Sequence, residues 1–182
     1  MTGVGDDQIE IVRSIVADSY VDMLRACGLS AFVVDSRAPA VTDERYVVGF
    51  IRFTGAVRGS LVITASSALY RITYPLGEGG SVQTSPGDIL DWAGEMANQT
   101  LGRVKRRFCE RGIDFEISTP TAVYERDVEG RASRGDVISV QVRVGAELSS
   151  IEFEIVASAD GGLLRDGATP IACLPEGELV MF

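Results

Sequence analysis

The chain has 182 residues, 46% of them apolar and 24% charged, which is typical of a single globular domain over residues 1–182 rather than of a disordered or fibrous protein. Its 17 basic and 26 acidic residues give a formal net charge of −9, which argues against nucleic acid as the main partner because phosphate-backbone binding needs a basic surface. Since the chain has no histidine, it cannot supply a histidine-dependent catalytic triad or a histidine-ligated zinc site.

Three further features concern membranes and cellular compartment. No apolar run approaches the roughly 20 residues needed to cross a bilayer, and the first seven residues lack the basic and apolar profile of a signal peptide. The three cysteines include no CxxC pair, so all three are expected to be reduced: Cys27, Cys109 and Cys173. We therefore expect a cytoplasmic protein that does not associate with membranes.

The first half of the chain predicts one long helix followed by three strands. Apolar side chains recur at three- and four-residue steps over Asp6–Cys27, and Gly28 follows as a helix stop. Runs rich in β-branched and aromatic residues then predict strands at Ala31–Val34, Tyr46–Thr54 and Val57–Thr64. A turn at Gly55 joins the last two strands, and a short helix is expected within Ser66–Leu76.

The second half repeats this order. Ser85 is a typical N-cap, with Pro86 at the first helical position and Asp88 three residues after the cap. This helix is expected to run to Arg111, with Gly112 as its C-cap. Three strands are expected to follow it: Phe115–Tyr124, Asp136–Val144 and Ile151–Val156. The repeated order of one helix and three strands predicts an α+β domain with an antiparallel sheet, two long helices packed on it and a weak internal duplication.

Motifs for nucleotide or metal binding are absent from the sequence. It contains no GxxxxGK[ST], GxGxxG or GxSxG pattern, and its acidic clusters do not follow a calcium-loop pattern, so no metal site is expected in this chain. The mixed-charge segment Glu125–Gly135 is expected to form an exposed loop or hairpin arm. The apolar end Leu179–Phe182 is a candidate edge strand.

The outer face of the second long helix is the surface most suited to chemistry. At about 100° per residue, four positions share an arc of roughly 60° opposite the apolar face, with Lys105 near its margin: Asp91, Glu95, Asn98 and Gly102. Solvated helix surfaces often carry such polar residues, so a plain surface remains an alternative. A glycine at an exposed helix position costs about 1 kcal/mol relative to alanine, however. Gly102 therefore suggests close approach of another molecule, or of another element of the fold.

A carboxylate and a carboxamide on one face restrict the chemistry that is available. Neither group is a strong base or a nucleophile at neutral pH, but together they can orient a water molecule and bind a cation. They suit a reaction whose electrophile is already activated, such as an acyl phosphate, because positioning then supplies much of the reduction in the barrier.

Two segments in register strengthen this interpretation. They are Asp91-Trp-Ala-Gly-Glu95-Met-Ala-Asn98-Gln-Thr-Leu-Gly102-Arg-Val-Lys105 and Ile117-Ser-Thr-Pro120-Thr-Ala-Val123. The two segments resemble the pattern of the CheX/CheC/FliY family of chemotaxis phosphatases. That pattern has an acid, a glutamate four residues later, an asparagine three residues after the glutamate, and a proline at the start of the next strand. CheC and FliY look like two-site proteins, with one site on each long helix. The matching stretch of the first helix here, Asp18–Arg25, has neither glutamate nor asparagine, so the chain looks most like single-site CheX.

This resemblance implies a CheC/CheX-like fold and a specific reaction. The substrate would be a phosphorylated CheY-like response regulator in chemotaxis or related two-component signalling, and the reaction would be hydrolysis of its aspartyl phosphate. Asn98 would hold the attacking water in line with phosphorus, and Glu95 would pair with the regulator's active-site lysine. Asp91, Gly102 and Lys105 would border the contact.

The resemblance also implies partners and leaves alternatives. Family members of the CheX type pair into homodimers through strand edges, and the Mg²⁺ of the reaction would belong to the regulator rather than to this chain. A non-catalytic module that binds a response regulator, or a flagellar-switch-type adaptor, is the main alternative. A purely structural dimer without a regulator partner is the third.

Overall fold

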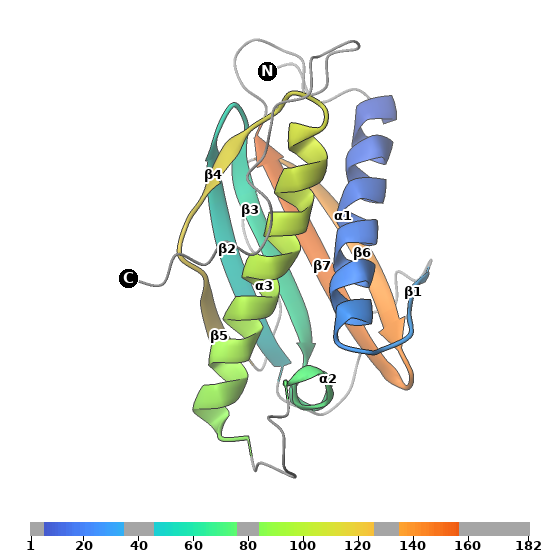
Figure 1. The fold of residues 1–182 in the computed structure, drawn as a ribbon, viewed down its shortest axis with the longest axis vertical. Coiled ribbons are helices and arrows are strands. Elements are labelled where there is room, and N and C mark those ends of the chain that lie inside the picture. Colours follow the sequence, from blue (N-terminus) through green and yellow to red (C-terminus); the bar gives the residue numbers. More distant parts are fainter. Residues whose placement is uncertain (1–5, 35–45, 76–83, 126–134, 157–182) are drawn as a thin grey trace.

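The structure, a computed structural model, describes residues 6–34, 46–75, 84–125 and 135–156 (Figure 1). Its helices are α1 (Asp6–Ala26), α2 (Ser67–Thr73) and α3 (Pro86–Cys109). Its strands are β1 (Ala31–Val34), β2 (Tyr46–Gly55), β3 (Arg58–Ser66), β4 (Phe115–Ile117), β5 (Thr121–Glu125), β6 (Asp136–Val144) and β7 (Glu147–Val156). The predicted order of elements is confirmed. The expectations for Glu125–Gly135 and Leu179–Phe182 fall wholly or mainly outside the described residues.

The strands form one antiparallel sheet in the order β1-β6-β7-β3-β2-β4, with β5 also paired to β2. One unit consists of α1 with β1, β2 and β3, and the other of α3 with β4/β5, β6 and β7. In the sheet, β1 lies next to β6 and β7 of the second unit, and β4/β5 lies next to β2 and β3 of the first. The two units thus exchange their first strands, and the duplication expected from the sequence is present in the topology. Figure 1 shows α1 and α3 side by side on one face of the sheet. The fold is α+β, as predicted.

The predicted strand Phe115–Tyr124 is divided into β4 and β5. Between the pairs Phe53↔Ile117 and Phe50↔Thr121, three residues of this strand oppose two of β2, which is a β-bulge. Pro120 lies in the bulge and has no N–H to donate to the ladder, so continuous pairing cannot pass through it. The expectation of one unbroken strand is therefore wrong at this point.

The close approach of α3 to the sheet depends on Gly49 in β2. A Cβ atom at this position would lie 2.5 Å from the carbonyl oxygen of Ala93 and 3.5 Å from the Cβ of Ala97, both on α3. The inner side of α3 is fully buried at Ala93, Met96, Ala97, Leu101, Val104 and Phe108. The absence of a side chain at Gly49 lets the helix backbone rest directly on the strand, which fixes the height of α3 above the sheet.

Two remaining features concern the thiols and membrane crossing. Cys27 is free, whereas Cys109 is disulfide-bonded, so the expectation of reduced thiols is wrong for Cys109. Cys173 lies outside the described residues. None of the helices in the described ranges has the length and apolar character needed to span a membrane.

Candidate functional site

Helix α3 has a well-defined start because its first turn is capped. The Ser85 hydroxyl accepts a hydrogen bond from the Asp88 N–H at 3.2 Å, and the Ser85 N–H donates to the Asp88 carboxylate at 2.7 Å. This reciprocal capping box satisfies N–H groups that the helix itself leaves unpaired. Hydrogen bonds from the Ser85 side chain and backbone lower the pKa of Asp88. At the other end, α3 stops at Cys109, two residues before the predicted Arg111.

The outer face of α3 carries the five predicted site residues, and all of them remain accessible to some degree. Asp91 is exposed, and the other four are half-buried: Glu95, Asn98, Gly102 and Lys105. Their position opposite the buried side of the helix agrees with the helical spacing from which they were predicted. Neither Glu95 nor Asn98 is enclosed in the hydrophobic interior formed by the described residues, and both side chains keep some exposed surface.

Glu95 is held by a neighbour one helical turn further on. The Gln99 side-chain amide donates a hydrogen bond to Glu95 Oε1 at 2.9 Å. The geometry follows from the helix, since residues four apart lie on the same face within reach of each other. The Glu95 carboxylate on the outer face of α3 therefore has a defined orientation.

The Asn98 side chain differs from Glu95 because none of the described residues hydrogen-bonds to it. A carboxamide has one acceptor oxygen and two donor hydrogens, which suit it to hold a water molecule in a chosen direction. Asn98 lies three residues after Glu95, on a neighbouring part of the same face. The two side chains thus place an oriented carboxylate beside a carboxamide whose hydrogen-bonding groups remain available.

The side of this face that borders the sheet edge is formed by Gly94 and Pro120. Gly94 is buried, and a Cβ there would lie 3.7 Å from the Pro120 Cβ, an ordinary contact distance. The β4–β5 bulge brings Pro120 to this point, and the Tyr124 hydroxyl donates to the Pro86 carbonyl at 3.1 Å at the start of α3. Because the bulge touches the helix turn that carries Glu95 and Asn98, it helps to set their position.

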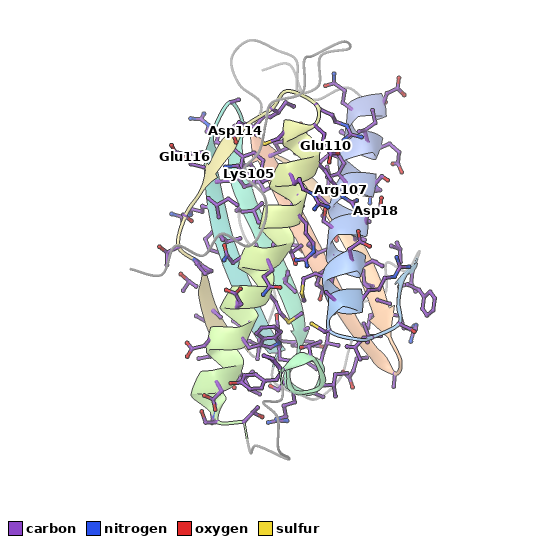
Figure 2. All side chains as sticks on the ribbon, in the orientation of Figure 1. Asp18, Lys105, Arg107, Glu110, Asp114 and Glu116 are labelled. Atoms are coloured by element: carbon purple, nitrogen blue, oxygen red, sulfur yellow. The ribbon has the colours of Figure 1, made fainter. Side chains whose placement is uncertain are left out.

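Ion pairs fix the C-terminal half of α3. Lys105 Nζ lies 3.2 Å from Asp114 Oδ1, and the Arg107 guanidinium reaches Asp18 at 3.3 Å and Asp22 at 2.6 Å on α1. Figure 2 shows Lys105 beside Asp114 and Arg107 between the two helices. Lys105, predicted to border a partner contact, is thus already paired within this chain. The acids of α1 that stand where a second site would be expected bind an arginine of this chain instead.

A carboxylate and a carboxamide on one helix face can orient a water molecule or bind a cation. In the described ranges, no three aspartate, glutamate, cysteine or histidine side chains gather closely enough to hold a metal ion. Two functional neighbours were not predicted from the sequence: Gln99 as the partner of Glu95, and Arg107 as the link to α1. The four-residue spacing to Glu95 could have indicated Gln99, whereas the pairing of Arg107 depends on how the two helices pack.

Comparisons with known proteins agree with the fold. A family model described as chemotaxis phosphatase CheX matches residues 47–143. No curated protein matches the chain. The crystal structure of the chemotaxis protein CheX from Vibrio vulnificus is 24% identical with a TM-score of 0.66, and the match covers 79% of this chain and 95% of that one. CheX from Desulfovibrio desulfuricans is 17% identical with a TM-score of 0.64, covering 80% and 99%.

A third similar structure is a complex. The CheX–CheY–BeF3–Mg²⁺ crystal structure from Borrelia burgdorferi is 14% identical with a TM-score of 0.58, and the match covers 78% of this chain and 96% of that one. The TM-scores of these three structures establish a common fold. The family model, in contrast, spans more than half of the sequence and includes the whole of α3 with the bulge after it. The chain therefore belongs to the chemotaxis phosphatase CheX family.

Proposed function

We propose that this chain hydrolyses the aspartyl phosphate of a CheY-like response regulator, with Glu95 and Asn98 as the residues that act on it. The observation that carries the proposal is the pair itself: an oriented carboxylate and a carboxamide without a partner among the described residues, three positions apart on an accessible helix face. Membership of a family described as chemotaxis phosphatases supports the reaction class. The Borrelia complex of a CheX with a CheY supports the class of partner.

The two residues have different roles in the proposed reaction. Glu95 accepts a hydrogen bond from the regulator's active-site lysine and so sets the position of α3 on the regulator. Asn98 then enters the regulator's active site and holds a water molecule in line with the phosphorus atom. Because phosphoryl transfer depends mainly on positioning and electrostatic stabilisation, a carboxamide is sufficient for this role.

The reaction balances without a cofactor held by this chain. The water oxygen forms a new bond to phosphorus while the bond between phosphorus and the aspartyl oxygen breaks, and the aspartate leaves with the electron pair as a carboxylate. The two protons of the water depart with the product, dihydrogen phosphate. Mg²⁺ held by the regulator would neutralise charge on the phosphoryl oxygens.

Asp91, Gly102 and Lys105 complete the proposed contact surface. Asp91 is exposed one turn before Glu95, and Gly102, which has no side chain, allows a partner to approach the helix one turn after Asn98. Lys105 would contact the regulator only by sharing or releasing Asp114, which it holds at 3.2 Å. We therefore assign Lys105 the most peripheral place in the contact.

We also propose that the chain forms a homodimer in the cytoplasm. Strand β1 lies at one edge of the sheet, where Phe32 is 63% exposed and Val33 53% exposed. An edge strand with exposed apolar side chains favours pairing with another chain. The proposed cytoplasmic location rests on the proposed partner, a CheY-like response regulator. Reduced thiols no longer support it, because Cys109 is disulfide-bonded.

One experiment separates this function from its alternatives. The protein is mixed with a phosphorylated CheY-like receiver domain from the same organism, and both phosphate release and binding are followed. Accelerated release of phosphate supports the proposed enzyme. Binding without release would identify a non-catalytic adaptor, and neither binding nor release would leave a structural role; either result contradicts the proposal.

A further inference from the structure

A stripe of four residues runs along α3 at four-residue steps: Glu95, Gln99, Arg103 and Arg107. The Gln99 amide donates to Glu95 Oε1 at 2.9 Å, and Arg103 Nη1 donates to the Gln99 carbonyl oxygen at 3.1 Å. Arg107 binds Asp18 and Asp22 of α1. The stripe thus runs from the proposed site on the outer face of α3 to the interface between the two long helices.

The hydrogen bond from Gln99 changes what Glu95 can offer a partner. A free glutamate on a helix surface rotates about three side-chain bonds, and fixing it on binding costs conformational entropy. Gln99 restrains this rotation before the partner arrives. It also uses one of the two lone pairs of Oε1, which makes this oxygen a weaker acceptor for a second donor, and leaves Oε2 without a partner among the residues the structure describes.

A carboxylate with one occupied oxygen discriminates between cations. An arginine guanidinium binds a carboxylate best through two parallel hydrogen bonds, one to each oxygen, whereas a lysine ammonium is a compact charge that needs only one. We infer that Gln99 is a positioning residue that presents Glu95 to its partner chiefly through Oε2 and so favours a lysine over an arginine. This inference deepens the proposed function and rests on it.

A purely structural role for Gln99 makes different predictions. If its hydrogen bond to Glu95 served only to stabilise the helix, as side-chain pairs four residues apart do, its loss would change thermal stability without changing recognition. A comparable pair on α1, Ser14 and Asp18 at 3.4 Å, lies on the other long helix and provides a matched control. Gln99→Met keeps the length and helix propensity of the side chain but removes the donor.

The test measures binding and turnover separately. The full-length protein, Gln99→Met and Ser14→Ala are titrated with a CheY-like receiver domain loaded with beryllofluoride and Mg²⁺, and kcat and KM are measured with the phosphorylated receiver. Gln99→Met is expected to raise the Kd about five-fold, the typical contribution of one hydrogen bond, and to raise KM similarly. Its kcat should remain within about two-fold, because Asn98 is untouched. Ser14→Ala should match the unmodified protein in all three quantities.

A second receiver, in which the active-site lysine is replaced by arginine, tests the selectivity. The unmodified protein should bind it at least about ten-fold more weakly than the lysine form, and Gln99→Met should reduce that difference to about two- or three-fold. The double-mutant cycle cancels whatever the replacement does to the receiver alone.

The outcomes distinguish this inference from the proposed function. If the unmodified protein hydrolyses the phosphorylated receiver but Gln99→Met has the same Kd and the same preference for lysine, the inference is wrong and the function stands. A lower melting temperature for Gln99→Met with unchanged Kd would likewise assign Gln99 a structural role and overturn the inference. If the unmodified protein neither binds nor hydrolyses any receiver tested, the proposed function fails and this inference fails with it.

Discussion

The position of the site helix can be tested at Gly49. An alanine Cβ there would lie 2.5 Å from the Ala93 carbonyl oxygen, and real Cβ atoms essentially never approach closer than 3.0 Å. The helix backbone would therefore have to move by about half an ångström, although it is anchored by a fully buried apolar face. Gly49 does not have a positive φ, so steric contact alone decides the outcome.

The expected cost follows from overpacking a close-packed interior. Forced shifts of this kind typically destabilise by about 1–3 kcal/mol. For a chain of this length, each kcal/mol lowers the melting temperature by roughly 2–4 °C, so we expect Gly49→Ala to lower it by about 2–12 °C. Calorimetry or circular dichroism in a thermal scan measures this change.

Gly94 is the matched control because it is a glycine of α3, next to Ala93, that faces a different neighbour. An alanine Cβ there meets Pro120 at 3.7 Å, which is ordinary van der Waals contact. Replacing a glycine within a helix by alanine contributes about 0.5–1 kcal/mol to stability, so Gly94→Ala should raise the melting temperature by about 1–4 °C. If Gly49→Ala proved neutral or stabilising, or if both variants shifted in the same direction, our account of how α3 packs on the sheet would be refuted.

Three other predictions concern the helix cap, the link between helices and the sheet edge. The lowered pKa of Asp88 means that folding favours its ionised form. Its contribution to stability is therefore present at neutral pH. It is lost as the pH falls through the folded-state pKa, which lies below the ordinary value of 3.8. Thermal scans from pH 7 to pH 2.5 should therefore show Asp88→Asn less stable than the unmodified protein at pH 7, with the difference becoming smaller as the pH falls below 3.8; a difference that does not depend on pH would contradict this. Arg107→Met should lower the melting temperature by about 2–4 °C through loss of the ion pairs to α1, with less effect in high salt, and an unchanged value would show that these pairs contribute nothing. Phe32→Glu should convert the proposed dimer to a monomer in sedimentation experiments, and a persistent dimer would exclude the β1 edge as the interface.

Local sequence signals predicted the helices and most of the strands because those signals act over a few residues. The capping residues Ser85 and Asp88 marked the start of α3, and hydrophobic periodicity assigned its buried side correctly. Strand β7 begins at Glu147, four residues before the predicted Ile151, because the mostly polar residues before Ile151 pair with β6 across a two-residue turn at Gly145. Their pairing depends on the neighbouring strand rather than on their own β propensity.

The candidate site was predictable as a set of residues but not as a set of contacts. The spacing of Glu95 and Asn98 placed them on one helix face without tertiary information. The pairing of Lys105 with Asp114 depends on the turn after α3, and the contact of Pro120 with Gly94 depends on the bulge in the neighbouring strand. Helix periodicity predicts neither contact, because Asp114 and Pro120 both lie outside α3.

The most direct test of the proposed mechanism is Asn98→Ala, studied with the phosphorylated receiver at saturating and limiting concentrations. If Asn98 only positions the attacking water, its loss should reduce kcat about 100-fold or more while the Kd for the beryllofluoride-loaded receiver stays within about two-fold. A variant that retains the unmodified rate of phosphate release would show that this carboxamide does not direct the reaction.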